Sequence, residues 1–209
     1  KVWVGLSKET AHQLGTPISS LMAWVEILKE SHPDDGLIPE MDKDVKRLEQ
    51  IAERFSKIGS LPEPKEGSMN EVLEHVIDYM DRRTSNKVEM VRDFPDHDVK
   101  VRMNASLFEW VVENLCKNAV DAMEGCGRIV LSLSDDDHKV VVEVTDNGNG
   151  IRKKDLKNVF KPGFTTKQRG WGLGLSLAGR IVEDYHHGRI FVKSSEVNKG
   201  TTFRVELRR

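Results

Sequence analysis

The chain has 209 residues, of which 32 are Lys or Arg and 34 are Asp or Glu, so its formal net charge is 32 − 34 = −2. This balance lacks the basic excess of a nucleic-acid-binding surface, and no apolar run approaches the roughly 18 residues of a membrane-spanning helix. We therefore expect a soluble, cytoplasmic chain without nucleic-acid or membrane contacts. Its two cysteines, Cys116 and Cys126, form no CxxC pair and are predicted to be free thiols. Because the chain does not begin with Met, we expect a longer protein with sensory or membrane-anchoring parts upstream.

The first sixty residues show the apolar spacing of packed helices. Within residues 3–30, apolar side chains recur at alternating intervals of three and four, and the pattern returns between Met41 and Phe55. A stretch rich in Pro, Asp and Gly interrupts it at 32–36. Since two helices with one apolar stripe each do not enclose a core, residues 1–60 are predicted to form a helical hairpin that dimerises into a four-helix bundle.

Residues 61–67 contain two prolines and a glycine and are predicted to be a linker between two domains. Residues 68–209 then show a mixed α/β pattern. Helices are predicted near 69–83, 105–123 and 173–186, and strands near 87–92, 99–102, 127–134, 138–145, 188–194 and 201–207. The third and fourth of these strands are adjacent and β-branched, so we expect them to pair as a hairpin.

Three segments of this second part carry polar or glycine-rich motifs. Asn114 and Asn118 are four residues apart and share one face of a predicted helix, with Asp121 about one turn further on. Asp146 ends a predicted strand and is followed by alternating glycines, which permit close approach of a ligand. A GxGxG stretch from Gly170 opens the last predicted helix, where free backbone N–H groups favour phosphate oxygens. Alone, each pattern also suits a solvated face or a structural turn, but their order and spacing together indicate a nucleotide site.

These segments resemble the kinase core of bacterial sensor histidine kinases, and the resemblance covers nearly the whole chain. The motifs that carry it are AHQLGTP at 11–17, NLCKNA at 114–119, DNGNG at 146–150, FKPGF at 160–164, GLGL at 172–175 and GTTF at 200–203. The resemblance implies a dimerisation and phosphotransfer hairpin over 1–60, followed by a catalytic α/β sandwich of the type shared by gyrase, chaperone and histidine-kinase ATPases over 68–209. It also implies ATP and Mg²⁺ as cofactors.

The same resemblance assigns roles to the residues of the predicted nucleotide site. Asp146 is expected to accept the adenine amino group, and Asn118 to offer its amide oxygen to Mg²⁺ with Asn114 in support. Lys167 is expected to neutralise the phosphates. The full predicted site consists of Asn114, Asn118, Asp121, Asp146, Gly148, Gly150, Lys167, Gly172, Leu173, Gly174, Leu175 and Thr201.

In the hairpin, the resemblance implies that His12 is phosphorylated from ATP and passes the phosphoryl group to an aspartate in the receiver domain of a response regulator. Thr16, on the same helical face, is the implied residue for dephosphorylating that regulator. The chain departs from the family at Gln13, where an acidic residue is common, because an amide takes no proton. Glu9, one turn earlier, is a candidate base, or the proton leaves by another route.

Asp121 is a second departure, since many members carry Lys there, and it matches the nitrogen-regulatory type of sensor kinase better. Two other functions stay open at this point. A hydrolytic ATPase of the same fold places Glu one turn before the metal-binding Asn, where this chain has Asn114, and this difference favours phosphoryl transfer. A nucleotide-binding scaffold without catalysis is the other alternative, because of Gln13.

Overall fold

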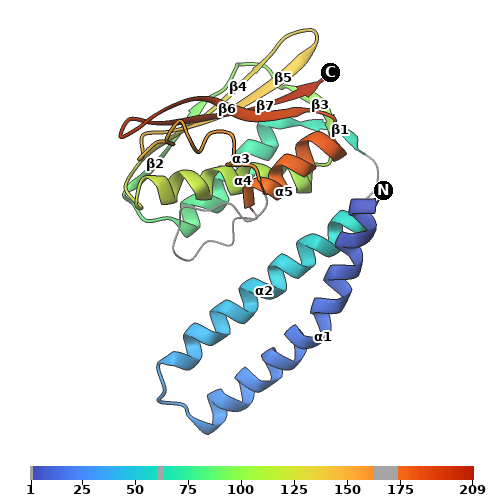
Figure 1. The fold of residues 1–209 in the computed structure, drawn as a ribbon, viewed down its shortest axis with the longest axis vertical. Helices are drawn as coiled ribbons and strands as arrows, with labels where there is room; N and C mark the ends of the chain where they lie inside the picture. The colour runs from blue at the N-terminus through green and yellow to red at the C-terminus, as the bar shows by residue number, and fades with distance from the viewer. Residues whose placement is uncertain (1, 61–63, 162–173) are drawn as a thin grey trace. The chain divides into compact units, whose positions relative to one another are not determined.

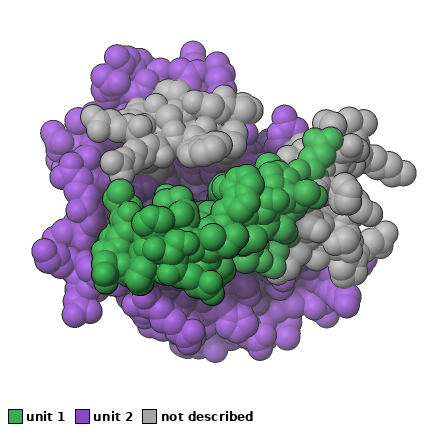
Figure 2. All heavy atoms as spheres, turned by 90° about the horizontal axis from the view of Figure 1, so that it is seen from below, with its two compact units in different colours: residues 1–63 green, residues 64–209 purple. Residues whose placement is uncertain are grey.

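The computed structural model describes residues 2–60, 64–161 and 174–209, with the backbone alone at 2–12, 51 and 54–60. The chain divides into two compact units, residues 1–63 and 64–209, which Figure 2 distinguishes by colour. No helix of the described residues is long and apolar enough to cross a membrane.

The first unit consists of two helices, α1 (Val2–Ser31) and α2 (Leu37–Ser60), that pack against each other (Figure 1). Val25 of α1 and Val45 of α2 are buried in one apolar cluster, around which Leu21 and Leu28 are partly buried. The second helix begins four residues before the first apolar residue of the predicted pattern, because the carboxylate of Asp35 accepts the Leu37 N–H at 3.0 Å and the turn ends there.

Several large apolar side chains of this unit are not covered by the hairpin itself. Among the described side chains of α1, those of Trp24 and Ile27 are the most exposed, at 61% and 60%. The others are Leu14, Leu37, Met41 and Leu48. The buried seam therefore takes up only part of the apolar surface that the two helices present.

The second unit is built on a five-stranded sheet in the order β2-β4-β5-β7-β6. These strands are β2 (Val88–Asp93), β4 (Gly127–Asp135), β5 (Lys139–Asp146), β6 (Arg189–Glu196) and β7 (Gly200–Arg208). Only β2 and β4 are parallel; the other neighbours are antiparallel, and the predicted hairpin of β4 and β5 is confirmed. Helices α3 (Met69–Arg83), α4 (Ala105–Ala122) and α5 (Gly174–Arg180) cover one face of the sheet (Figure 1), which gives the predicted α/β sandwich.

The core lies between α4 and the sheet. Val142 and Val144 of β5 are buried on the face toward the helices, while Glu143 between them points to the other face, as the period of two requires. Phe108 and Leu115 of α4 are fully buried against this surface. Asn104 caps α4 by accepting the Leu107 N–H at 3.1 Å, which fixes where the helix begins.

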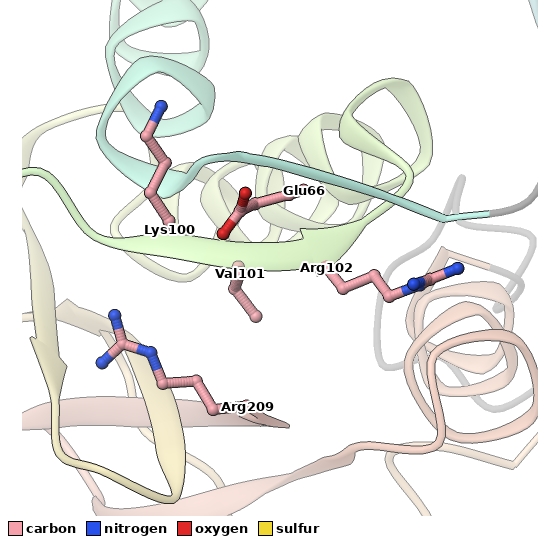
Figure 3. Close-up of a pocket in the computed structure, with 5 residues that line it drawn as sticks. All are labelled: Glu66, Lys100, Val101, Arg102 and Arg209. Atoms are coloured by element: carbon pink, nitrogen blue, oxygen red, sulfur yellow. The ribbon is translucent and has the colours of Figure 1, made fainter.

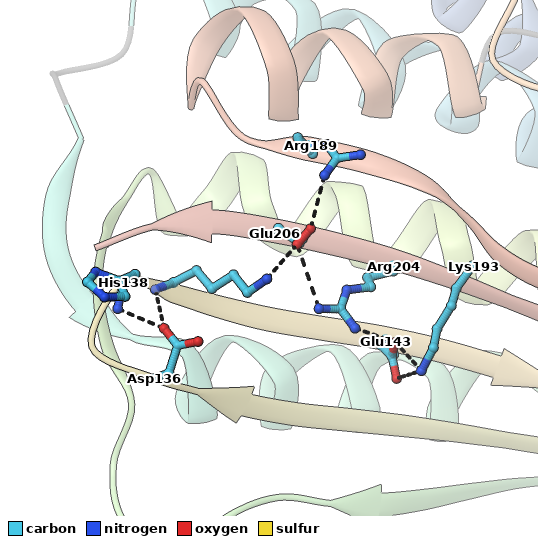
Figure 4. Close-up of polar contacts among 8 residues, drawn as sticks. Asp136, His138, Glu143, Arg189, Lys193, Arg204 and Glu206 are labelled. Carbon is cyan, nitrogen blue, oxygen red and sulfur yellow. Dashed lines mark hydrogen bonds and ion pairs between the residues drawn. The ribbon is translucent and has the colours of Figure 1, made fainter.

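Charged side chains tie together the opposite face of β5, β6 and β7 (Figure 4). Glu206 lies within ion-pair distance of Lys139, Arg189 and Arg204, at 3.3, 3.5 and 3.7 Å. Arg204 also reaches Glu143 at 3.4 Å. Cross-strand pairs of this kind favour one register, and β5 and β7 are the strands that carry Asp146 and Thr201.

Two predicted elements differ in the structure. The last residues of the predicted linker belong to a strand, β1 (Lys65–Ser68), which pairs antiparallel with β3 (Lys100–Met103) in a separate two-stranded sheet. The last predicted helix ends early at Arg180, and a π-helical turn, η1 (Ile181–Tyr185), continues it. Both differences depend on hydrogen-bond partners that the apolar pattern does not reveal.

Candidate nucleotide-binding site

The two asparagines of α4 lie in its C-terminal half, and both are half-buried. The Nδ2 atom of Asn114 is buried and has no hydrogen-bond partner among the described residues. A Cβ added at Gly174, the first residue of α5, would lie 3.4 Å from Asn114 Oδ1. The start of α5 therefore lies beside the unsatisfied amide, and a buried donor without a partner is costly unless a ligand meets it.

Asp146 is buried at the end of β5, with 5% of its surface exposed. Its Oδ1 accepts the N–H of Gly148 at 2.8 Å. Burial raises the pKa of the carboxyl, while hydrogen bonds from the backbone of Gly148 and Thr201 oppose that rise. Since an ionised carboxylate has more lone pairs than these two bonds use, Asp146 retains acceptor capacity in an otherwise enclosed position.

A hydroxyl pair lies next to Asp146. Thr201 faces Asp146 in the register of β5 and β7 and is buried. Its hydroxyl lies 2.8 Å from that of Ser195 on β6, which accepts the N–H of Ile151 at 2.8 Å. The structure thus brings Asp146 and Thr201 of the predicted site together, and adds Ser195, a strand serine that nothing in its local sequence distinguishes.

The glycines after Asp146 serve close packing of the backbone. A Cβ at Gly148 would lie 2.5 Å from the carbonyl oxygen of Ala122, at the end of α4. Gly150 has φ +72°, and its Cβ would lie 2.3 Å from the carbonyl oxygen of Glu196. The family resemblance implies that Gly150 lets a purine approach the backbone. The structure adds a packing requirement at this glycine, contact with the backbone of Glu196 at the end of β6.

The remaining residues of the predicted nucleotide site are only partly described. Lys167, Gly172 and Leu173 lie outside the described residues. Leu175 follows Gly174 at the start of α5 and is half-buried, and Asp121 is exposed on α4.

Phe160 and Lys161 are the described members of the FKPGF motif, and the Phe160 ring meets Phe203 edge to face at 6.0 Å. The aromatic ring therefore packs against β7.

In the hairpin, the described parts of the predicted phosphoacceptor segment lie on one continuous helix. Gln13 and Thr16 are exposed on α1, while the side chains of His12 and Glu9 lie outside the described residues. Pro17 lies inside α1 and has no N–H to donate to the carbonyl of Gln13. The backbone near His12 thus lacks one of the hydrogen bonds of a regular helix.

The second unit also has a surface hollow of about 410 Å³ (Figure 3). It is lined by Glu66, Lys100, Val101, Arg102 and Arg209. The lining carries both positive and negative charges, and two of the cations form ion pairs, Lys100 with Asp98 and Arg209 with Asp135. None of the described residues of the predicted site lines the hollow.

Both cysteines are free, as predicted. Cys116 is buried on α4, where burial raises the pKa of its thiol to about 12. This thiol therefore stays protonated at neutral pH and acts as an apolar side chain of the core.

Taken together, the sandwich, the buried carboxylate at a strand end and the unsatisfied amide beside a helix start define a nucleotide-binding domain. The family model of "Histidine kinase-, DNA gyrase B-, and HSP90-like ATPase" matches residues 103–209. The chain belongs to this family, and its relatives place it with the bacterial sensor histidine kinases.

One such relative is the sensor histidine kinase ZraS of Escherichia coli (strain K12), which is 30% identical over 213 residues, covering 97% of this chain and 44% of ZraS. The catalytic domain of histidine kinase ThkA is 30% identical with a TM-score of 0.64, covering 70% of this chain and 98% of that domain. A structure of ThkA in complex with response regulator protein TrrA shares the fold over 98% of this chain and 61% of that chain, with 24% identity and a TM-score of 0.67. The chain spans less than half the length of the curated relatives it matches.

Proposed function

We propose that the chain is the kinase core of a sensor histidine kinase: it binds Mg·ATP in residues 68–209, phosphorylates His12 and transfers the phosphoryl group to an aspartate of a response regulator. The observation that carries the proposal is the pair formed by buried Asp146 and the unsatisfied Nδ2 of Asn114. Asp146 can accept a further hydrogen bond, and Asn114 Nδ2 can donate one to a ligand. Both residues lie in a domain that belongs to a family of ATPases. In this proposal the protein acts in the cytoplasm.

The described residues fit an adenine nucleotide. Asp146 can accept the adenine amino group, and the buried carboxylate discriminates against bases that lack this donor, because it would then stay unpaired. The hydroxyls of Thr201 and Ser195 lie beside it and can hold a bridging water or a ring nitrogen.

At the phosphate end, Asn114 Nδ2 can donate to a phosphate oxygen and the Asn118 amide oxygen is a hard ligand that suits Mg²⁺. When bound, the ion would neutralise charge on the phosphates. Backbone N–H groups at the start of α5 add further donors toward the same anion.

In the hairpin, neutral imidazole near pH 7 is a nucleophile for the γ-phosphoryl group, and no strong base is needed to generate it. Gln13 cannot accept a proton as an acidic residue at this position would. The reaction therefore depends mainly on positioning and on electrostatic stabilisation of the transferred group. A missing acid–base group slows such a step by about 10²–10⁴-fold, and does not abolish it.

Incubation of the chain with γ-labelled ATP and Mg²⁺ tests the proposal against its alternatives. We expect acid-labile label on the protein, which then moves to a receiver domain. Released phosphate without labelled protein would indicate a hydrolytic ATPase. Nucleotide binding with neither product would indicate a scaffold.

We further propose that two hairpins form a homodimeric four-helix bundle, because apolar residues including Met41 and Leu48 are exposed in the single hairpin. Replacing both by Lys is expected to give a monomer, and Gln50→Lys, which adds one positive charge at an exposed polar position of the same helix, is expected to remain dimeric. Sedimentation velocity at tens of micromolar measures both. A monomeric wild-type chain would contradict the dimer.

Thr16 is exposed on α1, four residues after His12, and its hydroxyl can orient a water toward the phosphoaspartate of a bound regulator. Thr16→Ala is therefore expected to spare labelling of His12 and to slow regulator dephosphorylation by about tenfold or more. Ser19→Ala, also exposed on α1, is the matched control. Equal dephosphorylation by wild type and Thr16→Ala would leave Thr16 as an ordinary helix residue.

A further inference from the structure

His186 closes the π-helical turn η1 and joins it to another helix. The backbone N–H of His186 donates to the carbonyl of Ile181 at 3.1 Å, and ring Nδ1 lies 2.9 Å from the same oxygen. On the other side of the ring, the backbone N–H of Asn104 donates to Nε2 at 3.0 Å. Since Nε2 accepts, the proton of the neutral ring is on Nδ1, so both ring nitrogens are satisfied in a single tautomer.

The surroundings of the ring favour this neutral form. Phe108 of α4 meets the imidazole edge to face at 5.8 Å, and Tyr185 meets it at 5.0 Å. Burial lowers the pKa of His186, the bond to Ile181 opposes that change, and neighbouring His187 adds to it. A charged ring would present a second donor to the Asn104 N–H and lose that bond.

This contact lies at one end of a pair of packed helices. Both α5 and η1 contact α4, and His186 meets Asn104 where α4 begins. Figure 1 shows α5 beside α4. Ten residues further along α4, roughly 15 Å away, Asn114 meets Gly174 where α5 begins. The two segments therefore run antiparallel with one specific contact at each end, and buried Ala178 and Ile181 lie between them.

We propose that His186 is a positioning residue for the nucleotide site: it fixes the axial position of α5–η1 along α4, and so holds Gly174 and the first N–H groups of α5 against Asn114. The contact acts at a π-helical turn, where hydrogen bonding departs from the regular helix and such turns often accompany functional sites. Without it, α5 samples other positions and the nucleotide must order it on binding, which lowers affinity. This inference rests on the proposed function.

Two substitutions separate the ring's two contacts. In His186→Gln the amide oxygen reaches the place of Nε2 and can still accept from Asn104, whereas His186→Asn keeps only a donor at the place of Nδ1. We expect the Asn variant to bind Mg·ADP about tenfold more weakly by calorimetry, since a buried donor loses its acceptor, and the Gln variant to bind within about twofold of wild type. Hydrogen exchange should increase over 174–185 in the Asn variant and stay unchanged in β4 and β5.

The inference is overturned if the Asn variant matches wild type in affinity and exchange, or if the Gln variant loses as much as the Asn variant. Nitrogen NMR of the wild-type imidazole provides a test that needs no variant: Nδ1 should carry the proton at neutral pH, and an Nε2-protonated ring would contradict the contact with Asn104. If wild-type protein binds no Mg·ADP, the proposed function fails, and the exchange and NMR measurements still decide the role of His186.

Discussion

His12→Gln is expected to abolish labelling of the chain by γ-labelled ATP. Glutamine has the size of histidine but no nucleophilic nitrogen at neutral pH, so no phosphoramidate forms. Nucleotide affinity should not change, because the proposed ATP site lies entirely in residues 68–209. The measurement is label on protein after separation at neutral pH, with Mg·ADP affinity determined in parallel by calorimetry.

The matched control is His32→Gln, which changes an exposed histidine of the same hairpin and should leave labelling as in wild type. Acid treatment adds a chemical check, because phosphohistidine is acid-labile and phosphoserine is not. Label that survives either His12→Gln or acid would contradict His12 as the acceptor and the kinase mechanism with it.

Much of the fold could be predicted from local pattern. Helix α3 begins and ends at the predicted residues 69 and 83, because Ser68 caps it by accepting the Glu71 N–H and its apolar residues keep the helical period. Strand β5 followed from its run of valines. Strand β1 could not be predicted in this way, since its residues have the composition of a linker and its partner strand, β3, lies more than thirty residues away.

The candidate site likewise contains residues that the local sequence predicts and residues that it does not. Asp146 could be singled out only because its motif, which alone also suits a turn, occurs with the asparagine and glycine-rich segments in a specific order and spacing; the side chain is buried in the structure. Ser195 and His186 act through partners distant in sequence, Ile151 and Asn104, so no local spacing marks them. The packing requirement for a glycine at position 150 could not be predicted either, because it depends on the backbone of Glu196.

Asp146→Asn is expected to weaken Mg·ATP binding by about ten- to a hundredfold. The carboxylate accepts a charge-assisted hydrogen bond from the adenine amine, and such bonds contribute about 1.5–3 kcal/mol. An amide is uncharged, and if its NH₂ group faces the adenine amine, two donors meet. Asp137→Asn, at an exposed position between β4 and β5, is the matched control and should bind as wild type. Calorimetric titration measures all three proteins.

Asp146→Asn should affect the stability of the nucleotide-free protein differently from its affinity for nucleotide. Because burial raises the pKa of Asp146, the folded state holds its proton more tightly than the unfolded chain does. The ionised carboxylate thus opposes folding at neutral pH, and this cost disappears as pH falls through the raised pKa. Asp146→Asn should therefore leave the melting temperature at pH 7 unchanged or higher while nucleotide affinity falls. Unchanged affinity for Mg·ATP in this variant would place the adenine elsewhere, and a large loss of stability would show that Asp146 serves the fold instead.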